Sequence, residues 1–242
     1  MATKAVSPAR IQARRLPRLF FTTVSALVAV AAFVGFARTY YLKEIFGTRP
    51  LPLLVHVHGV VMTCWVALLM VQSLLVAWAR TDLHRRLGVF GGVLAAMIVT
   101  VGAAVSIHAV RSGHVNPRMS PLAFLVIPLG DIVLFGILVA AALYYRRRPE
   151  LHKRLMIVAT IAILPAALAR WPWPLIAHQP PRFFAATDVL LIGIIAFDYV
   201  RTHRLSPAYL WGGLVLVASH PLRLMLADTQ AWQTLAHWIT GI

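Results

Sequence analysis

Histidine is the residue type in this sequence with the widest capacity for chemistry. The chain has ten histidines among 242 residues, beside a single cysteine, Cys64, and seven acidic residues. Neutral imidazole ligates haem iron and transition metals, and it gains or loses a proton near neutral pH. No phosphate-binding glycine loop, HExxH motif, nucleophile elbow or CxxCH haem-attachment motif accompanies the histidines. The composition therefore favours metal, haem or proton chemistry at imidazole groups.

The motif HVHG at 56–59 opens an apolar stretch and contains two of the histidines. Residues two positions apart on a helix point about 200° apart, so His56 and His58 do not converge on one metal in a regular helix. His58, Trp65 and Gln72 fall on one face of such a helix. We expect this polar and aromatic stripe to face a helix bundle, which makes His58 the better ligand and leaves His56 near the outer interface.

A short internal repeat carries two further histidines. The segment RTDLHRRL at 80–87 matches RPELHKRL at 148–155, and each copy opens an apolar stretch. The match predicts a duplicated helix hairpin, in which expected helices at 51–79 and 87–110 are followed by a copy at 121–145 and 155–176, related by an axis along the membrane normal. His84 and His152 would then approach each other across the bundle. They are either structural or headgroup-facing histidines, or a shared ligand or quinone-head site.

Ionisable residues also interrupt the apolar stretches: Asp131, Arg170, Asp188 and His220. A charge in hydrocarbon is costly, so such residues are expected to be functional or to be paired with one another. On the functional interpretation, Arg170 serves a haem propionate or another anionic group, and Asp188 orients a ligand imidazole. On the structural interpretation, Arg170 forms an ion pair with Asp131 or Asp188. His152 and Arg170 are separated by a whole number of turns of about 3.6 residues, which predicts one shared helix face.

The elements that must position these side chains are long and apolar. Hydrophobic residues make up 60% of the chain and charged residues 12%, against about 25% charged residues in soluble proteins. A helix of about 20 residues crosses the hydrocarbon core, and the alternation of a β-barrel is missing. The first stretch is longer than the apolar core of about 7–15 residues in a signal peptide, so we expect a retained helix. We predict an all-α polytopic membrane bundle of about seven transmembrane helices, at 19–37, 51–79, 87–110, 121–145, 155–176, 183–200 and 207–226.

Charge predicts the orientation of this bundle. The net charge is +16, and roughly two thirds of the Lys and Arg residues fall on the cytoplasmic side if the N-terminus is inside and the C-terminus outside. We therefore predict a basic cytoplasmic segment at 1–18, the bundle at 19–226 and an outer interfacial tail at 227–242, with a surface helix at 231–238. The basic residues lie in short loops that meet lipid headgroups, so the lipid bilayer rather than nucleic acid is the expected partner.

Two blocks of the sequence resemble a large bacterial family of multi-pass membrane proteins whose activity is not known. The blocks comprise HVHG at 56–59, Trp65, Gln72 and LHRRLG at 83–88, then HKRLM at 152–156 and Arg170. The likeness covers residues 50–175, and it implies a multi-pass fold in the bacterial inner membrane and supports the choice of these residues. A more distant likeness, carried by the HKRLM block, is to small histidine-rich membrane proteins involved in haem–copper oxidase assembly.

These observations give one leading functional prediction and two alternatives. Histidines at two membrane depths suit a haem b or transition-metal protein that transfers electrons or handles a cofactor for a respiratory complex. Its ligands would be His58 and His220 in the outer half, with His84 and His152 as an inner pair. A copper or other metal site would need only the outer set: His56, His58, Asp188 and His220. The alternatives are a non-catalytic accessory or scaffold subunit, and a small-molecule carrier.

Overall fold

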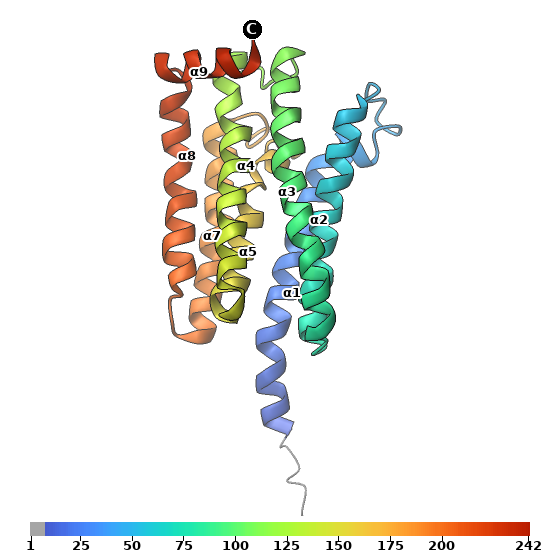
Figure 1. Ribbon diagram of the computed structural model, residues 1–242, viewed down its shortest axis with the longest axis vertical. Coiled ribbons are helices and arrows are strands. Elements are labelled where there is room, and N and C mark those ends of the chain that lie inside the picture. Colours follow the sequence, from blue (N-terminus) through green and yellow to red (C-terminus); the bar gives the residue numbers. More distant parts are fainter. Residues whose placement is uncertain (1–7) are drawn as a thin grey trace, which may run out of the picture.

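The computed structural model describes the backbone of residues 8–242 and the side chains of residues 19–242. Within this part of the chain, seven helices are long and apolar enough to cross a membrane (Figure 1). The prediction of an all-α bundle with seven membrane-spanning helices is confirmed, and the protein is a multi-pass membrane protein. The elements are α1 (Pro8–Phe36), η1 (Ala37–Tyr41), α2 (Leu53–Ala77), α3 (Thr81–Arg111), α4 (Pro121–Tyr144), η2 (Tyr145–Arg147), α5 (Pro149–Ala162), α6 (Pro165–Leu168), α7 (Pro180–Thr202), η3 (Tyr209–Gly213), α8 (Leu214–Ala227) and α9 (Gln230–Thr240).

The connections between the helices gather at the two ends of the bundle (Figure 1). The α2–α3, α4–α5 and α7–η3 connections lie at the end where α1 starts, and the α3–α4 connection and α9 lie at the opposite end. In the orientation that charge predicts, the first of these is the cytoplasmic end. We call it the inner end and the opposite one the outer end. The basic segment predicted at 1–18 lies outside the residues whose side chains are described, and residues 1–7 lie outside the described chain.

Proline at the first helical position, and serine just before α4, explain where several helices begin. α4, α5 and α7 start at Pro121, Pro149 and Pro180, where the missing N–H costs no helical hydrogen bond. Ser120 also caps α4, because its Oγ accepts a hydrogen bond from Ala123 N at 3.3 Å. Local chemistry thus sets these helix starts before any packing is considered.

The fifth predicted stretch, 155–176, differs from the structure at both ends. α5 starts ahead of this range and stops well before its end, and the short α6 follows after a break. Pro165 has no N–H to continue the helix ladder, and the chain forms a turn at 163–164. The chain has also left the helix before Arg170. The prediction that His152 and Arg170 share one face of one continuous helix is therefore wrong.

The polar and aromatic stripe on α2 faces the bundle as predicted. Trp65 is 2% exposed, and its ring packs edge-on against Phe135 of α4 with the ring centroids 4.9 Å apart. The Trp65 Nε1 donates a hydrogen bond to Thr160 Oγ1 of α5 at 3.2 Å. Gln72 and His58, on the same face of α2, lie against α3. The stripe therefore joins α2 to three other helices.

The C-terminal tail forms a helix where a surface helix is predicted. α9 lies across the outer end of the bundle rather than along it (Figure 1). Trp232 Nε1 donates to Leu122 O at 2.9 Å, and Arg111 Nε donates to Thr240 O at 2.6 Å. These two hydrogen bonds fix α9 to the ends of α4 and α3.

α1 and α6 approach each other so closely at Gly35 that a side chain does not fit between them. A Cβ atom at Gly35 would lie 2.3 Å from the backbone oxygen of Ala167, which moves only if α6 moves. We expect Gly35→Ala to lower the free energy of unfolding by about 1–3 kcal/mol, the usual cost of overpacking a core. Gly193→Ala in α7 is the matched control, because nothing lies within 4 Å of the added Cβ. Thermal unfolding of both variants in detergent checks the prediction, and equal stability of the two would contradict it.

Candidate functional site

The two histidines of the internal repeat meet at the inner end of the bundle. His84 lies near the start of α3 and His152 near the start of α5. Their ring centroids are 6.3 Å apart and their ring planes are at 83°. The structure therefore brings these two residues together across the bundle, as the repeat predicts.

The hydrogen bonds of this pair leave ring nitrogens free. His152 Nδ1 lies 2.8 Å from Ala142 O, and because a carbonyl only accepts, this nitrogen carries the hydrogen. In the neutral ring, His152 Nε2 then has the lone pair. His84 Nδ1 is buried without a partner among the described side chains. Gln72 Nε2 donates to His84 O at 3.1 Å, while its Oε1 is also buried without a partner there. An imidazole oriented by a carbonyl is typical of a metal-ligating histidine.

A second buried histidine lies in the outer half, between α7 and α8. His220 is 2% exposed, and its Nδ1 is hydrogen-bonded to Asp188 Oδ1 at 2.8 Å. Its ring stacks on Phe184, with the centroids 4.2 Å apart and 14° between the planes. His220 Nε2 is buried and has no partner within the part of the chain described. The carboxylate of Asp188 keeps the hydrogen of the neutral ring on Nδ1 and leaves Nε2 as the electron-pair donor.

An ion pair that sequence reasoning missed lies beside His220. Arg223 of α8 donates from Nη1 to Asp131 Oδ1 of α4, and also to Ile127 O at 3.1 Å. The side chains of Arg223 and Asp131 are 6% and 5% exposed, and the guanidinium lies 4.9 Å from the Phe184 centroid. In the sequence, Arg223 lies near the outer end of the predicted stretch 207–226 and counts among the charges of the outer side. Its position one helical turn after His220 is the available indication that it shares the buried face.

Arg170 pairs with neither Asp131 nor Asp188, so the predicted structural ion pair is wrong. Both aspartates are already bound to side chains of α8. Arg170 is exposed, and its Nη1 donates to a backbone oxygen of α6 at 2.6 Å. Its guanidinium lies 5.1 Å from the ring centroid of Phe36. The break at Pro165 places Arg170 in the connection after α6, away from the face that the aspartates occupy.

His58 and His56 occupy different environments on α2. The His58 ring lies beside Gly102 of α3, and its Nδ1 is buried without a partner among the described residues. The His56 ring packs instead against Tyr40, with the ring centroids 5.9 Å apart. The prediction that His58 is the inward residue of the two agrees with this arrangement.

The outer metal set predicted from the sequence is not gathered at one point. Within residues 8–242, no group of three or more His, Cys, Asp or Glu side chains lies close enough together to hold a metal ion. The four residues of that set therefore form no single cluster. Among the predicted site residues, the structure brings together two pairs: His84 with His152, and His220 with Asp188.

A buried ionic cluster near the inner end was not predicted from the sequence. Arg154 Nε donates to Asp198 Oδ2 at 2.7 Å, which joins α5 to α7, and Arg201 Nη2 donates to Asp198 Oδ1 at 2.7 Å. Arg154 is 4% exposed and Asp198 is 1% exposed. In the sequence, Arg154 belongs to the basic part of the repeat and is typical of a headgroup anchor. Only the rotation of α5 about its axis turns it inward.

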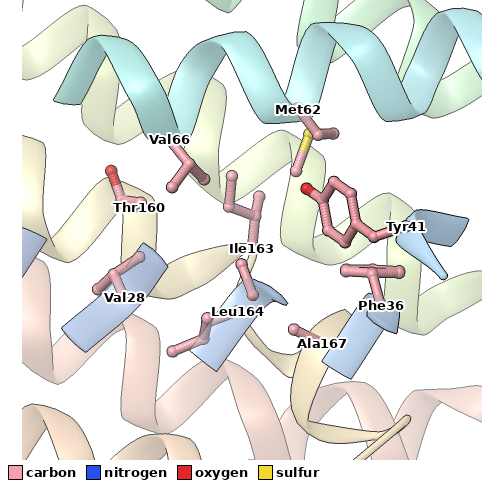
Figure 2. A pocket seen from close by; sticks show the side chains of 10 residues that line it. Val28, Phe36, Tyr41, Met62, Val66, Thr160, Ile163, Leu164 and Ala167 are labelled. Atoms are coloured by element: carbon pink, nitrogen blue, oxygen red, sulfur yellow. The ribbon is translucent and has the colours of Figure 1, made fainter. Parts of the chain in front are cut away.

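A small apolar cavity lies where α1 and α2 pack against the break between α5 and α6 (Figure 2). Its volume is about 40 Å³, and side chains from all of these segments line it, among them Val28, Met62, Thr160 and Leu164. Ligand pockets usually begin at about 300 Å³, so this cavity is too small for a haem or a quinone ring. It marks a gap in the packing next to Pro165.

The fold and the site together define a class of protein: a multi-pass membrane bundle with buried imidazole groups near both of its ends. Comparison of the chain with protein-family models, with curated proteins and with solved structures found no match. The family resemblance based on the HVHG and HKRLM blocks stays a prediction.

Proposed function

We propose that this protein binds a redox cofactor, haem b or a transition metal such as copper, at histidine side chains. Its task would be to transfer electrons, or to handle the cofactor for a respiratory complex, in the bacterial inner membrane. The observation that carries the proposal is the imidazole pair of His84 and His152 at the inner end. The two rings come from separate helices. His84 Nδ1 is buried without a partner in the described part of the chain, and the hydrogen bond at His152 Nδ1 leaves its Nε2 with the lone pair.

The two rings are close enough to ligate one group together, because their centroids are 6.3 Å apart. Imidazole ligates haem iron and copper alike, so the donor set suits either group. A bound haem or copper would supply one-electron chemistry, while the chain supplies two ligands and the Ala142 carbonyl that orients one of them.

The outer half would supply the second depth that an electron carrier requires. His220 and His58 each keep one buried ring nitrogen without a partner among the described residues. Buried polar atoms normally have a partner, so an unpartnered atom calls for an explanation, of which a ligand is one. Asp188 holds the ring of His220 through its hydrogen bond, and Arg170 would serve as a cation for an anionic group such as a propionate.

The optical spectrum and metal content of the purified full-length protein test this proposal. After expression with added iron and copper, we expect either a Soret band that shifts on reduction or a stoichiometric amount of copper. The absence of a Soret band, together with the absence of iron, copper and zinc by elemental analysis, would overturn the proposal. Solvent extraction of the same sample tests for a quinone, the other occupant that a pair of hydrogen-bonding imidazoles suits.

A second function is favoured by a different observation, the two buried ion pairs. Arg223 with Asp131 joins α4 to α8, and Arg154 with Asp198 joins α5 to α7. A non-catalytic accessory subunit of a membrane complex needs polar contacts of this kind to fix how its helices pack. This function predicts a protein that co-purifies with a membrane complex and never contains a cofactor.

A further inference from the structure

A surface cavity of about 310 Å³ lies at the turn between α4 and α5, at the inner end. Tyr144, Tyr145, Arg147 and Arg148 line it. Both arginines are exposed, and the Cζ atom of Arg148 lies 5.8 Å from the centroid of the Tyr145 ring. Among the side chains of residues 19–242, neither arginine forms an ion pair with a carboxylate. The cavity therefore carries uncompensated positive charge.

Three other cations near the inner end differ from Arg147 and Arg148, because each is paired with a carboxylate. Lys153 and Arg154, in the first turns of α5, are each 2.5 Å from a carboxylate oxygen of Glu150. Arg201 is 2.7 Å from a carboxylate oxygen of Asp198. Each of these cations has a carboxylate partner within the protein, whereas the two arginines of the cavity have none among the described side chains and are available to an anion from outside.

The face of α4 that leads to the cavity is turned outward and apolar. Val133, Ile137, Ala140 and Tyr144 are exposed, and their helical spacing places them in one stripe along the helix. Val133 is 57% exposed, Ile137 is 60% exposed and Tyr144 is 80% exposed. α4 spans the membrane, so this stripe contacts acyl chains and its inner end lies at the level of the headgroups.

We propose that this cavity binds the phosphate of an anionic phospholipid headgroup, with the acyl chains of the same lipid along the exposed stripe of α4. A guanidinium group donates paired hydrogen bonds to phosphate oxygens, and the tyrosine hydroxyls add further donors. Free phosphate uses only the polar part of this site, whereas a phospholipid uses the arginines and the apolar stripe together. The site is separate from the histidine pair, and it does not depend on the proposed cofactor.

Native mass spectrometry of the full-length protein in detergent, titrated with phosphatidylglycerol, tests the site. The double variant Arg147→Gln with Arg148→Gln should bind this lipid about tenfold more weakly, because two cationic contacts at the membrane surface are lost. The matched control is Arg85→Gln with Arg86→Gln, which should bind as the wild type does. It removes the same charge from the first turns of α3, also at the inner end, at exposed positions that do not line the cavity. Phosphatidylcholine should bind the wild type more weakly than phosphatidylglycerol.

Equal weakening by the two glutamine double variants would overturn the proposal, because it would indicate a general effect of charge. Equal binding of phosphatidylcholine and phosphatidylglycerol would overturn it as well. Displacement of the bound lipid by millimolar inorganic phosphate would also overturn it, and would indicate a site for free phosphate. The variant Arg147→Lys with Arg148→Lys keeps the charge but loses the paired donors, so it should bind the lipid more weakly than the wild type. This variant keeps the test valid if the glutamine double variant does not fold.

Discussion

Arg223→Met should lower the free energy of unfolding by about 3–5 kcal/mol, the cost of removing one partner from a buried ion pair. Methionine fills a similar volume, but it leaves the carboxyl group of Asp131 buried at 5% exposure without a cation. That carboxylate must then take up a proton or stay uncompensated, and both outcomes are unfavourable. Denaturant or thermal unfolding in detergent, followed by circular dichroism, measures the change.

Two further variants separate this effect from a general loss of charge. Asp82→Asn breaks an exposed pair with 4.0 Å between Arg80 Nε and Asp82 Oδ1, and it should cost at most about 1 kcal/mol. Arg223→Met combined with Asp131→Asn removes both buried charges, so it should recover most of the stability lost in the single variant. Equal stability of the Arg223→Met and Asp82→Asn proteins would contradict the structural role of the buried pair.

Complete loss of the cofactor held at the inner end is expected from either His84→Ala or His152→Ala. Each substitution removes one of the two imidazoles that would hold the group at the inner end. The Soret band or the copper content assigned to this pair should therefore disappear in both variants. His203→Asn is the matched control, because His203 is exposed and ends α7 in a left-handed conformation, with φ of 53°, which Asn tolerates well. Absorption spectra and elemental analysis of the purified variants measure the result.

The accessory function predicts the opposite pattern for the same proteins. In that case the wild type contains no cofactor, and His152→Ala loses only the hydrogen bond to Ala142 O, worth about 0.5–1.5 kcal/mol. A cofactor retained at the wild-type level in both alanine variants would contradict the inner pair as the ligand set. A cofactor absent from the wild type would contradict the cofactor proposal as a whole and support the accessory function.

The membrane-spanning helices could be predicted from the sequence because hydrocarbon imposes a simple condition on them. Each needs a long apolar run whose backbone groups bond within the helix, and hydropathy measures such runs directly. The prediction of helix limits is poorest where something other than the length of an apolar run decides where a helix ends. The break between α5 and α6 was not predicted, because average hydropathy does not register the N–H that Pro165 lacks. The short α6 and the position of Arg170 could not be predicted for the same reason.

The part of the candidate site that follows from the internal repeat could be predicted from the sequence. The part that depends on how each helix is rotated about its axis could not. The repeat gives His84 and His152 equivalent positions in two hairpins, so their contact follows from the sequence. The partners of Asp131 and Asp198 depend instead on how each helix turns about its own axis and tilts against its neighbours. Those angles are set by packing between helices, and spacing within one helix does not determine them.

The two buried ion pairs join neighbouring helices at two different levels of the bundle. Arg154 and Asp198 hold α5 to α7 near the inner end, and Arg223 and Asp131 hold α4 to α8 toward the outer end. Helices fastened at a single level keep the freedom to splay at the far end. Because His220 also links α8 to α7 through its hydrogen bond, separating these two helices at the outer end must first stretch that bond. A molecule that approaches from the outer side must therefore disrupt this hydrogen bond to reach the His220 ring.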